Sequence, residues 1–191
     1  MLTVLVIDES RSRAGEICAG LALAGYQVAA ILAGSKNLTA EVEKLQPDVI
    51  LIDTDSPSRD TLENLAAMHK DMPRPVVIFT QEDGQATIRD AVRAGVSAYV
   101  VDGLDPKRIK PIVEVARARF EDTQALRREL DEISQKLSDR KLVDKAKGVL
   151  MKARGLDEEA AYHAMRKLAM ERGQTMAKVA RDVIDMARVL L

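Results

Sequence analysis

The chain has 191 residues, of which 47% are hydrophobic and 31% are charged. This length allows one domain or two small ones, and this composition excludes an intrinsically disordered chain. The single cysteine excludes an internal disulfide, and because only two histidines accompany it, a Cys/His metal cluster is excluded as well.

Charge is distributed unevenly along the chain. The formal net charge is −1, but residues 135–191 carry 13 Lys or Arg against 8 Asp or Glu, a net of +5, which leaves −6 on residues 1–134. We therefore predict an acidic body followed by a basic tail domain. The N-terminus enters an apolar strand without a basic leader, and no apolar stretch approaches the roughly 18 residues that span a bilayer. We expect a cytoplasmic protein with no membrane partner.

Apolar runs alternate with amphipathic stretches through the first 120 residues. Short runs rich in β-branched residues predict buried strands at 2–7, 28–32, 49–52, 76–79 and 98–101. Amphipathic stretches predict helices at about 11–24, 37–45, 59–71, 84–94 and 105–120. The strands lack clean polar alternation, as expected when helices cover both faces of a parallel sheet. We predict an α/β domain over 1–120 with a doubly wound (βα)5 sheet.

The pattern changes after this domain. From Pro111 to about Ala153 the only helix-breaking residue is Gly148, which predicts one continuous helix. Its residues Leu126, Leu130, Ile133 and Leu137 are spaced four, three and four apart, the spacing of a coiled-coil seam of about two heptads. This helix could lie on its own domain or pair with a second copy. The charges that flank the seam favour pairing, so we predict a dimer coiled coil over 113–140.

Two shorter helices complete the chain. Gly155 ends the long helix, and the acidic residues 157–159 favour the start of the next helix, which is predicted to stop at Gly173. Thr175 is a suitable N-cap for a last helix that reaches about Val189. We therefore predict an all-α three-helix domain over 136–191.

Polar residues follow the predicted strands where each strand ends. Asp8 and Glu9 end the first strand, Asp53 ends the third and Thr80 ends the fourth. In a doubly wound sheet the carboxyl ends of the strands form the ligand site, so these side chains should meet. Clustered carboxylates need a divalent cation, and oxygen ligands suit Mg²⁺. A carboxylate beside such a metal can act as a nucleophile toward phosphorus.

This pattern resembles the receiver domain of response regulators, which has a flavodoxin-like fold, over about residues 1–120. The resemblance is carried by the segments 7–9 (Ile-Asp-Glu), 52–57 (Ile-Asp-Thr-Asp-Ser-Pro), 79–80 (Phe-Thr) and 94–101 (Ala-Gly-Val-Ser-Ala-Tyr-Val-Val). It implies that Asp53 is the phospho-acceptor and that Mg²⁺ is held by Asp8, Glu9, Asp53 and the backbone carbonyl of Asp55. Thr80 would be the switch hydroxyl and Tyr99 the switch aromatic. A histidine kinase or another sensor protein would be the partner.

One departure from the receiver pattern concerns charge. Receivers place a lysine three residues after the switch aromatic, whereas this chain has Asp102-Gly103 there. The change adds negative charge to an acidic pocket instead of neutralising a phosphoryl group. We therefore expect Mg²⁺ affinity to persist and the receiver to serve as a docking platform rather than as a phosphorylation switch.

The segment 140–154 is the most distinctive part of the tail. Apolar residues at a spacing of three and four place one face inward. Basic residues lie around the remainder: Arg140, Lys141, Lys145, Lys147, Lys152 and Arg154. Gly148 costs about 1 kcal/mol in mid-helix relative to Ala, which predicts a role in close packing or in backbone approach.

The tail resembles the ANTAR domain, an RNA-binding antiterminator module, over about 136–190. The resemblance is carried by the segments 146–151 (Ala-Lys-Gly-Val-Leu-Met), 157–162 (Asp-Glu-Glu-Ala-Ala-Tyr), 168–170 (Leu-Ala-Met) and 175–180 (Thr-Met-Ala-Lys-Val-Ala). It implies that the basic residues of 140–154 contact RNA. The tail's only aromatic residue, Tyr162, is predicted to lie in the small core.

A receiver joined to an ANTAR domain resembles transcription antiterminators that bind two-hairpin leader RNA and prevent terminator formation. Within that group the chain is most similar to NasT-type regulators of nitrate and nitrite assimilation, which a nitrate-sensing protein controls. A homodimer would be the active form. The alternative is a phosphorylation-switched protein-interaction adaptor with a dimerising helical tail. An enzyme is not expected, because the pocket has no general base beside a substrate cleft.

Overall fold

The computed structural model describes residues 1–9, 13–101 and 105–190. The chain divides into two compact units, Met1–Gln124 and Ala125–Leu191, and each is described by itself. The division into domains at 1–120, 113–140 and 136–191 stays a prediction. None of the helices in the described ranges is long and apolar enough to cross a membrane.

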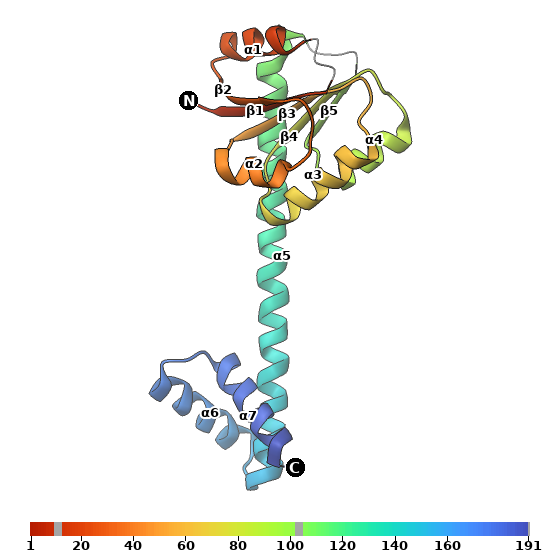
Figure 1. The fold of residues 1–191 in the computed structure, drawn as a ribbon. Coiled ribbons are helices and arrows are strands. Elements are labelled where there is room, and N and C mark those ends of the chain that lie inside the picture. The colour runs from red at the N-terminus through yellow and green to blue at the C-terminus, as the bar shows by residue number, and fades with distance from the viewer. Residues whose placement is uncertain (10–12, 102–104, 191) are drawn as a thin grey trace. The chain divides into compact units, whose positions relative to one another are not determined.

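The first unit is built on one parallel sheet (Figure 1). Its strands are β1 (Thr3–Asp8), β2 (Gln27–Leu32), β3 (Val49–Asp53), β4 (Val76–Thr80) and β5 (Ala98–Val101), each within one residue of its predicted span. Their order across the sheet is β2-β1-β3-β4-β5. The chain passes from β1 to β2 on one side of β1 and then crosses to β3 on the other side. The carboxyl ends of β1 and β3 therefore flank the switch point at which doubly wound sheets bind ligands.

Helices cover both faces of this sheet, as the apolar strands require. Helix α1 (Ala14–Leu23) and the first turns of α5 (Pro106–Arg154) pack on one face, where Ile17, Leu21, Ile109 and Val113 are buried. Helices α2 (Leu38–Leu45), α3 (Arg59–Asp71) and α4 (Gln85–Arg93) pack on the other face through Leu38, Val42, Leu65, Met68 and Ala91. The predicted α/β doubly wound fold is confirmed.

One close approach fixes the turn between α4 and β5. Gly95 has a φ of +93°, and a Cβ there would lie 2.6 Å from the ring of His69. Only glycine meets both conditions without strain. The His69 ring in turn packs edge-on against Phe120 of α5, with ring centroids 6.0 Å apart.

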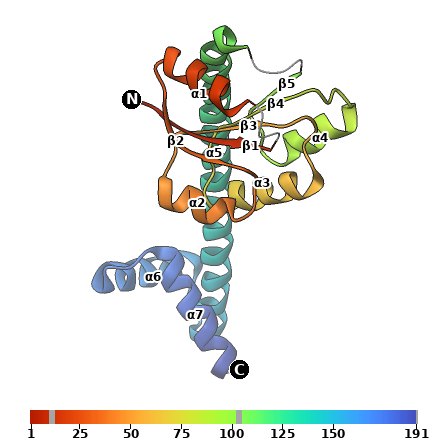
Figure 2. The same cartoon turned by 45° about the horizontal axis from the view of Figure 1, so that its top comes forward.

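The second unit consists of three helices. The predicted long helix is present: α5 runs from Pro106 to Arg154, and its last turns pack with α6 (Glu158–Arg172) and α7 (Met176–Leu190), as Figure 2 shows. The buried side chains between them include Ala146, Met165, Ala169, Val179, Ala180 and Ile184. The predicted N-cap is confirmed, since the Thr175 hydroxyl accepts a hydrogen bond from Lys178 N at 3.2 Å. At the other junction, Asp157 caps α6 by accepting from Ala160 N at 2.7 Å.

Candidate functional site

The structure brings two of the predicted acidic residues together at the sheet's switch point. Asp8 and Asp53 are register partners at the ends of β1 and β3. Both are buried, and Asp53 is fully inaccessible. Burial raises the pKa of the Asp53 carboxyl above its usual value, and the nearby charge of Asp8 adds to that rise. Two adjacent buried carboxylates need a compensating cation.

An arginine that the sequence analysis did not single out supplies positive charge here. Arg13, directly before α1, places its Nε 2.9 Å from Asp53 Oδ2 and its Nη2 3.8 Å from Asp55 Oδ1. The guanidinium opposes the rise in the pKa of Asp53. A cation at the positive end of a helix is electrostatically unfavourable unless an anion lies nearby. An arginine at the start of a predicted helix is therefore the sequence signal for a carboxylate close to it.

Two further predicted metal donors are engaged within the protein. Glu9 Oε1 accepts a hydrogen bond from the Thr61 hydroxyl of α3 at 2.7 Å. The Asp55 carbonyl accepts from Thr80 Oγ1 at 2.9 Å and from Gln81 N at 3.2 Å. No three Asp, Glu, His or Cys side chains are gathered as a cation site in the part of the chain that the structure describes. Asp8 and Asp53 are therefore the predicted donors best placed to meet a cation.

The predicted switch residues are connected through the loop after β4. The Thr80 hydroxyl donates to the Asp55 carbonyl and accepts from Glu82 N at 3.1 Å. The Tyr99 hydroxyl donates to the carbonyl of the same Glu82 at 2.9 Å. Burial raises the pKa of the Tyr99 phenol, which keeps it protonated as a donor. One chain of hydrogen bonds thus links Tyr99 to the loop that follows Asp53. The predicted departure at Asp102-Gly103 lies outside the described residues.

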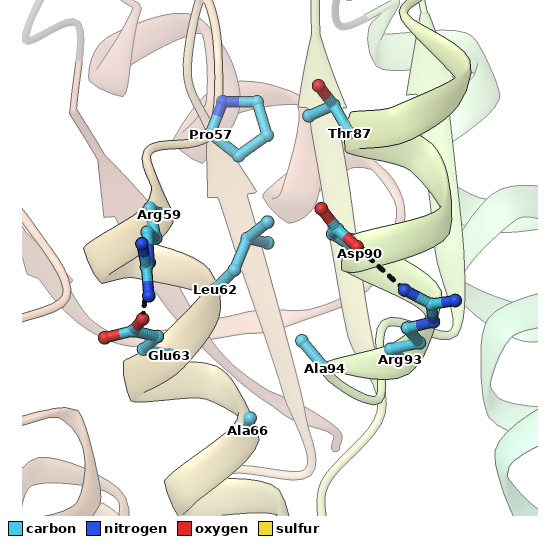
Figure 3. Close-up of a pocket in the computed structure, with 9 residues that line it drawn as sticks. All are labelled: Pro57, Arg59, Leu62, Glu63, Ala66, Thr87, Asp90, Arg93 and Ala94. Carbon is cyan, nitrogen blue, oxygen red and sulfur yellow. Dashed lines mark hydrogen bonds and ion pairs between the residues drawn. The ribbon is translucent and has the colours of Figure 1, made fainter.

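A separate hollow lies between α3 and α4 (Figure 3). Leu62, Ala66 and Ala94 line it with apolar surface. The charged residues on its walls pair along their own helices: Arg59 with Glu63 at 2.7 Å, and Arg93 with Asp90 at 3.3 Å. Because each of these charges has an opposite charge on its own helix, the lining favours neither an anionic nor a cationic ligand. The acidic pocket stays the candidate site of this unit.

In the helical unit, the predicted RNA-contacting residues lie on the last turns of α5. Five of them are exposed and have no carboxylate within 4.0 Å among the described residues: Arg140, Lys141, Lys145, Lys152 and Arg154. Lys147 differs. Its Nζ lies 2.8 Å from Asp144 Oδ1 and 2.7 Å from Glu158 Oε1, and only 15% of its side chain is exposed. Hydrogen bonds to these carboxylates raise the pKa of Lys147, so its ammonium group joins α5 to the start of α6.

Two other predictions for this unit have different outcomes. The prediction that Tyr162 lies in the core is wrong: its side chain is 41% exposed and packs edge-on against the ring of His163. Ala161 and Met165 occupy the core face of α6 instead. The four residues of the predicted seam, Leu126, Leu130, Ile133 and Leu137, are all 54% to 66% exposed. They form an apolar stripe that lies outside the core of the helical unit.

We expect Arg13→Gln to lower the free energy of unfolding by about 1–2 kcal/mol at pH 7, because it leaves Asp53 buried without its cation. This magnitude lies between those of fully buried and exposed ion pairs, as Arg13 is partly exposed. In an Asp53→Asn background the same change should have little effect. Urea denaturation of the four chains completes the double-mutant cycle.

The matched control is Arg59→Gln, which breaks an exposed pair with a similar N–O distance. It should leave the unfolding midpoint unchanged. Equal losses from Arg13→Gln in the native and the Asp53→Asn backgrounds would contradict the coupling.

Comparison with known proteins assigns both parts of the chain. The family model for the response regulator receiver domain matches residues 4–114, and that for the ANTAR domain matches residues 131–184. The transcriptional regulatory protein PdtaR of Mycobacterium tuberculosis is 29% identical over 161 residues, which cover 84% of this chain and 78% of that protein. The nitrate regulatory protein of Klebsiella oxytoca is 37% identical over 75 residues, 39% of this chain and 19% of that protein.

Solved structures agree on the fold of the first unit. The receiver domain of a modulated diguanylate cyclase from Desulfovibrio desulfuricans has a TM-score of 0.56 at 20% identity, over 63% of this chain and 98% of that one. A CheY-like receiver protein from Methanospirillum hungatei also has a TM-score of 0.56 at 20% identity, over 64% and 98%. The chain therefore belongs to the response-regulator receiver family and joins its receiver domain to an ANTAR domain, the architecture of RNA-binding antiterminators.

Proposed function

We propose that this protein is a transcription antiterminator that binds two-hairpin leader RNA and prevents a terminator stem from forming. The observation that carries this proposal is the group of five exposed cations on α5, Arg140, Lys141, Lys145, Lys152 and Arg154, which have no carboxylate within 4.0 Å among the described residues. Cations that the protein leaves unneutralised are available to RNA phosphates. Lys147 serves a different purpose in this proposal, since it holds α5 against α6.

The exposed stripe of Leu126, Leu130, Ile133 and Leu137 supports a homodimer as the active form. Leucine and isoleucine at this spacing pair with a second copy as a parallel coiled coil. Two helical units on one dimer would bind the two hairpins of one transcript. The second contact would then be intramolecular, which raises the overall affinity without any new contact.

The acidic receiver would control RNA binding through a sensor protein or a histidine kinase. In this proposal Asp8 and Asp53 would hold Mg²⁺, since Glu9 and the Asp55 carbonyl are hydrogen-bonded within the protein. A bound Mg²⁺ would supply positive charge toward a phosphoryl group on Asp53. Arg13 contacts the same Asp53 carboxylate and would therefore compete with the ion for it. The similarity to a protein named nitrate regulatory protein supports genes of nitrate or nitrite assimilation as targets.

Filter binding tests the RNA proposal. For the full chain and a one-hairpin RNA, log K should fall with log[salt] at a slope of about −3.5, since five cations each release about 0.7 counterion from a single-stranded loop. A two-hairpin leader should bind more tightly than either hairpin alone. An RNA of equal length that cannot form hairpins is the control. Absent or salt-insensitive binding would remove the proposal.

A further inference from the structure

Gly148 occupies the centre of the exposed face of α5 that carries the free cations. Lys145 lies three residues before it and Lys152 four residues after it. Asp144 lies four residues before it and Met151 three residues after it. In a helix these four positions surround residue 148 on the surface. The middle of the basic face therefore has no side chain.

The fold itself does not require this glycine. Gly148 has an ordinary helical backbone, and a Cβ added there would meet no heavy atom within 4 Å among its described neighbours. Close packing inside the protein, one of the two roles that the sequence predicted, is therefore excluded. Glycine weakens a helix interior relative to alanine. Since this loss brings no internal contact, the remaining role is to let a molecule from outside approach the helix backbone.

The space beside Gly148 is a hollow with a defined lining. Arg140, Asp144, Lys147, Met151 and Glu158 form its walls together with the glycine. Asp144 and Glu158 each pair one carboxylate oxygen with Lys147 Nζ. Each carboxylate retains a second oxygen that can accept a hydrogen bond. Because Lys147 contacts both groups, it holds their two remaining acceptors near one another.

The lining selects a nucleobase rather than a phosphate. Lys147 is already paired with both carboxylates, so a phosphate in the hollow would meet one free cation, Arg140, against two carboxylates. Carboxylate oxygens, in contrast, accept hydrogen bonds from the exocyclic amino groups of bases. Met151 is partly exposed and offers a polarizable apolar surface to the face of a base. Uracil presents carbonyl oxygens on both sides of its single N–H and is disfavoured.

We infer that the hollow at Gly148 receives one unstacked loop base that carries an exocyclic amino group, while Lys145 and Lys152 contact the phosphates beside it. Unpaired loop bases are the parts of a folded RNA that proteins read. This inference rests on the proposed function, because it takes RNA as the ligand. It adds a position at which the protein discriminates between bases.

Binding selection tests the inference. The full-length chain is incubated with a pool of two-hairpin RNAs that have randomised loops, and the bound RNAs are sequenced. The wild-type chain should enrich loops in which one position excludes uracil. Gly148→Leu fills the hollow and should bind the enriched RNAs on the order of tenfold more weakly, with base preference lost at that position. Its affinity for RNAs with uracil at that position should be unchanged, since the lysines remain.

Two further variants make the test specific. Gly148→Ala should raise the thermal midpoint of unfolding and yet weaken binding of the enriched RNAs, so reduced folding cannot explain the loss. Gly15→Ala is the matched control, because Gly15 is an exposed helical glycine of α1 whose added Cβ also meets nothing within 4 Å. It should leave RNA binding unchanged.

The outcomes separate this inference from the proposed function. Salt-dependent binding by the wild-type chain, with Gly148→Leu retaining full affinity and base preference, would overturn the inference and leave the proposed function intact. A chain with Asp144→Ala and Glu158→Ala that still excludes uracil as strongly as the wild type would also overturn it, because neither carboxylate acceptor would remain. No RNA binding by the wild-type chain would instead remove the proposed function.

Discussion

A chain that carries Leu130→Glu together with Ile133→Glu is expected to stay monomeric and to bind a two-hairpin RNA about 100-fold more weakly than the wild-type chain. In a parallel coiled coil, residues at core positions face their own copies. The two substitutions would place two layers of like charge in the seam. The affinity of this variant for a single hairpin should be unchanged, because the basic face of 140–154 is not altered.

The expected loss does not depend on misfolding. Leu130 is 66% exposed and Ile133 is 55% exposed, so neither side chain contributes a buried contact within one chain. Glutamate is also a good helix former, which preserves α5. Sedimentation across a range of protein concentrations measures the oligomeric state, and filter binding with one-hairpin and two-hairpin RNAs measures the affinities.

The matched control is Val115→Glu, a similar change at a 54% exposed position of the same helix that lies outside the seam. It should leave both the oligomeric state and RNA binding unaltered. A dimer that persists after the double substitution would show that another surface joins the two copies. If the affinities for one-hairpin and two-hairpin RNAs fell equally, the seam residues would affect RNA binding by a single helical unit. The loss would then not come from the missing second contact.

The fold was predictable because it depends on patterns within short segments. The strands of the receiver consist of uninterrupted apolar residues, and a Gly, Pro or polar residue stands near each end. The pairing of Asp8 with Asp53 also follows from topology, since parallel strands on either side of a switch point end at the same edge. Thr175 was predictable as an N-cap because its hydroxyl acts on the backbone three residues ahead.

The details of the sites depend on side chains that meet across segments, which periodicity does not report. Arg13 reaches Asp53 from the start of another element, and Thr61 reaches Glu9 from α3. Spacing alone places Lys147 among the cations of one face, although Glu158, eleven residues later, takes part in neutralising it. The residue type of Tyr162 predicts a place in the core, yet small and flexible side chains fill that core. In each case the local sequence allows several partners, and packing decides among them.

The distinction between paired and free lysines leads to the second large expected effect. Lys141→Gln, Lys145→Gln and Lys152→Gln combined should reduce the salt dependence of binding to a one-hairpin RNA by about 2 in the slope of log K against log[salt]. This change follows from the loss of three phosphate contacts at about 0.7 counterion each. If the wild-type and variant chains have equal affinity at 1 M salt, a difference of about 2 in slope corresponds to about a 100-fold loss of affinity at 0.1 M salt.

The helical unit offers a control with the same change in charge. Lys136, Lys167 and Lys178 each have a carboxylate within 4.0 Å, namely Glu132, Glu171 and Asp182. Their combined replacement by Gln alters the net charge equally but removes cations that the protein already neutralises. Binding should then keep its salt slope and lose little affinity. If both triple variants weakened binding alike, net charge rather than the α5 face would drive the association, and the assignment of RNA contacts to residues 140–154 would fail.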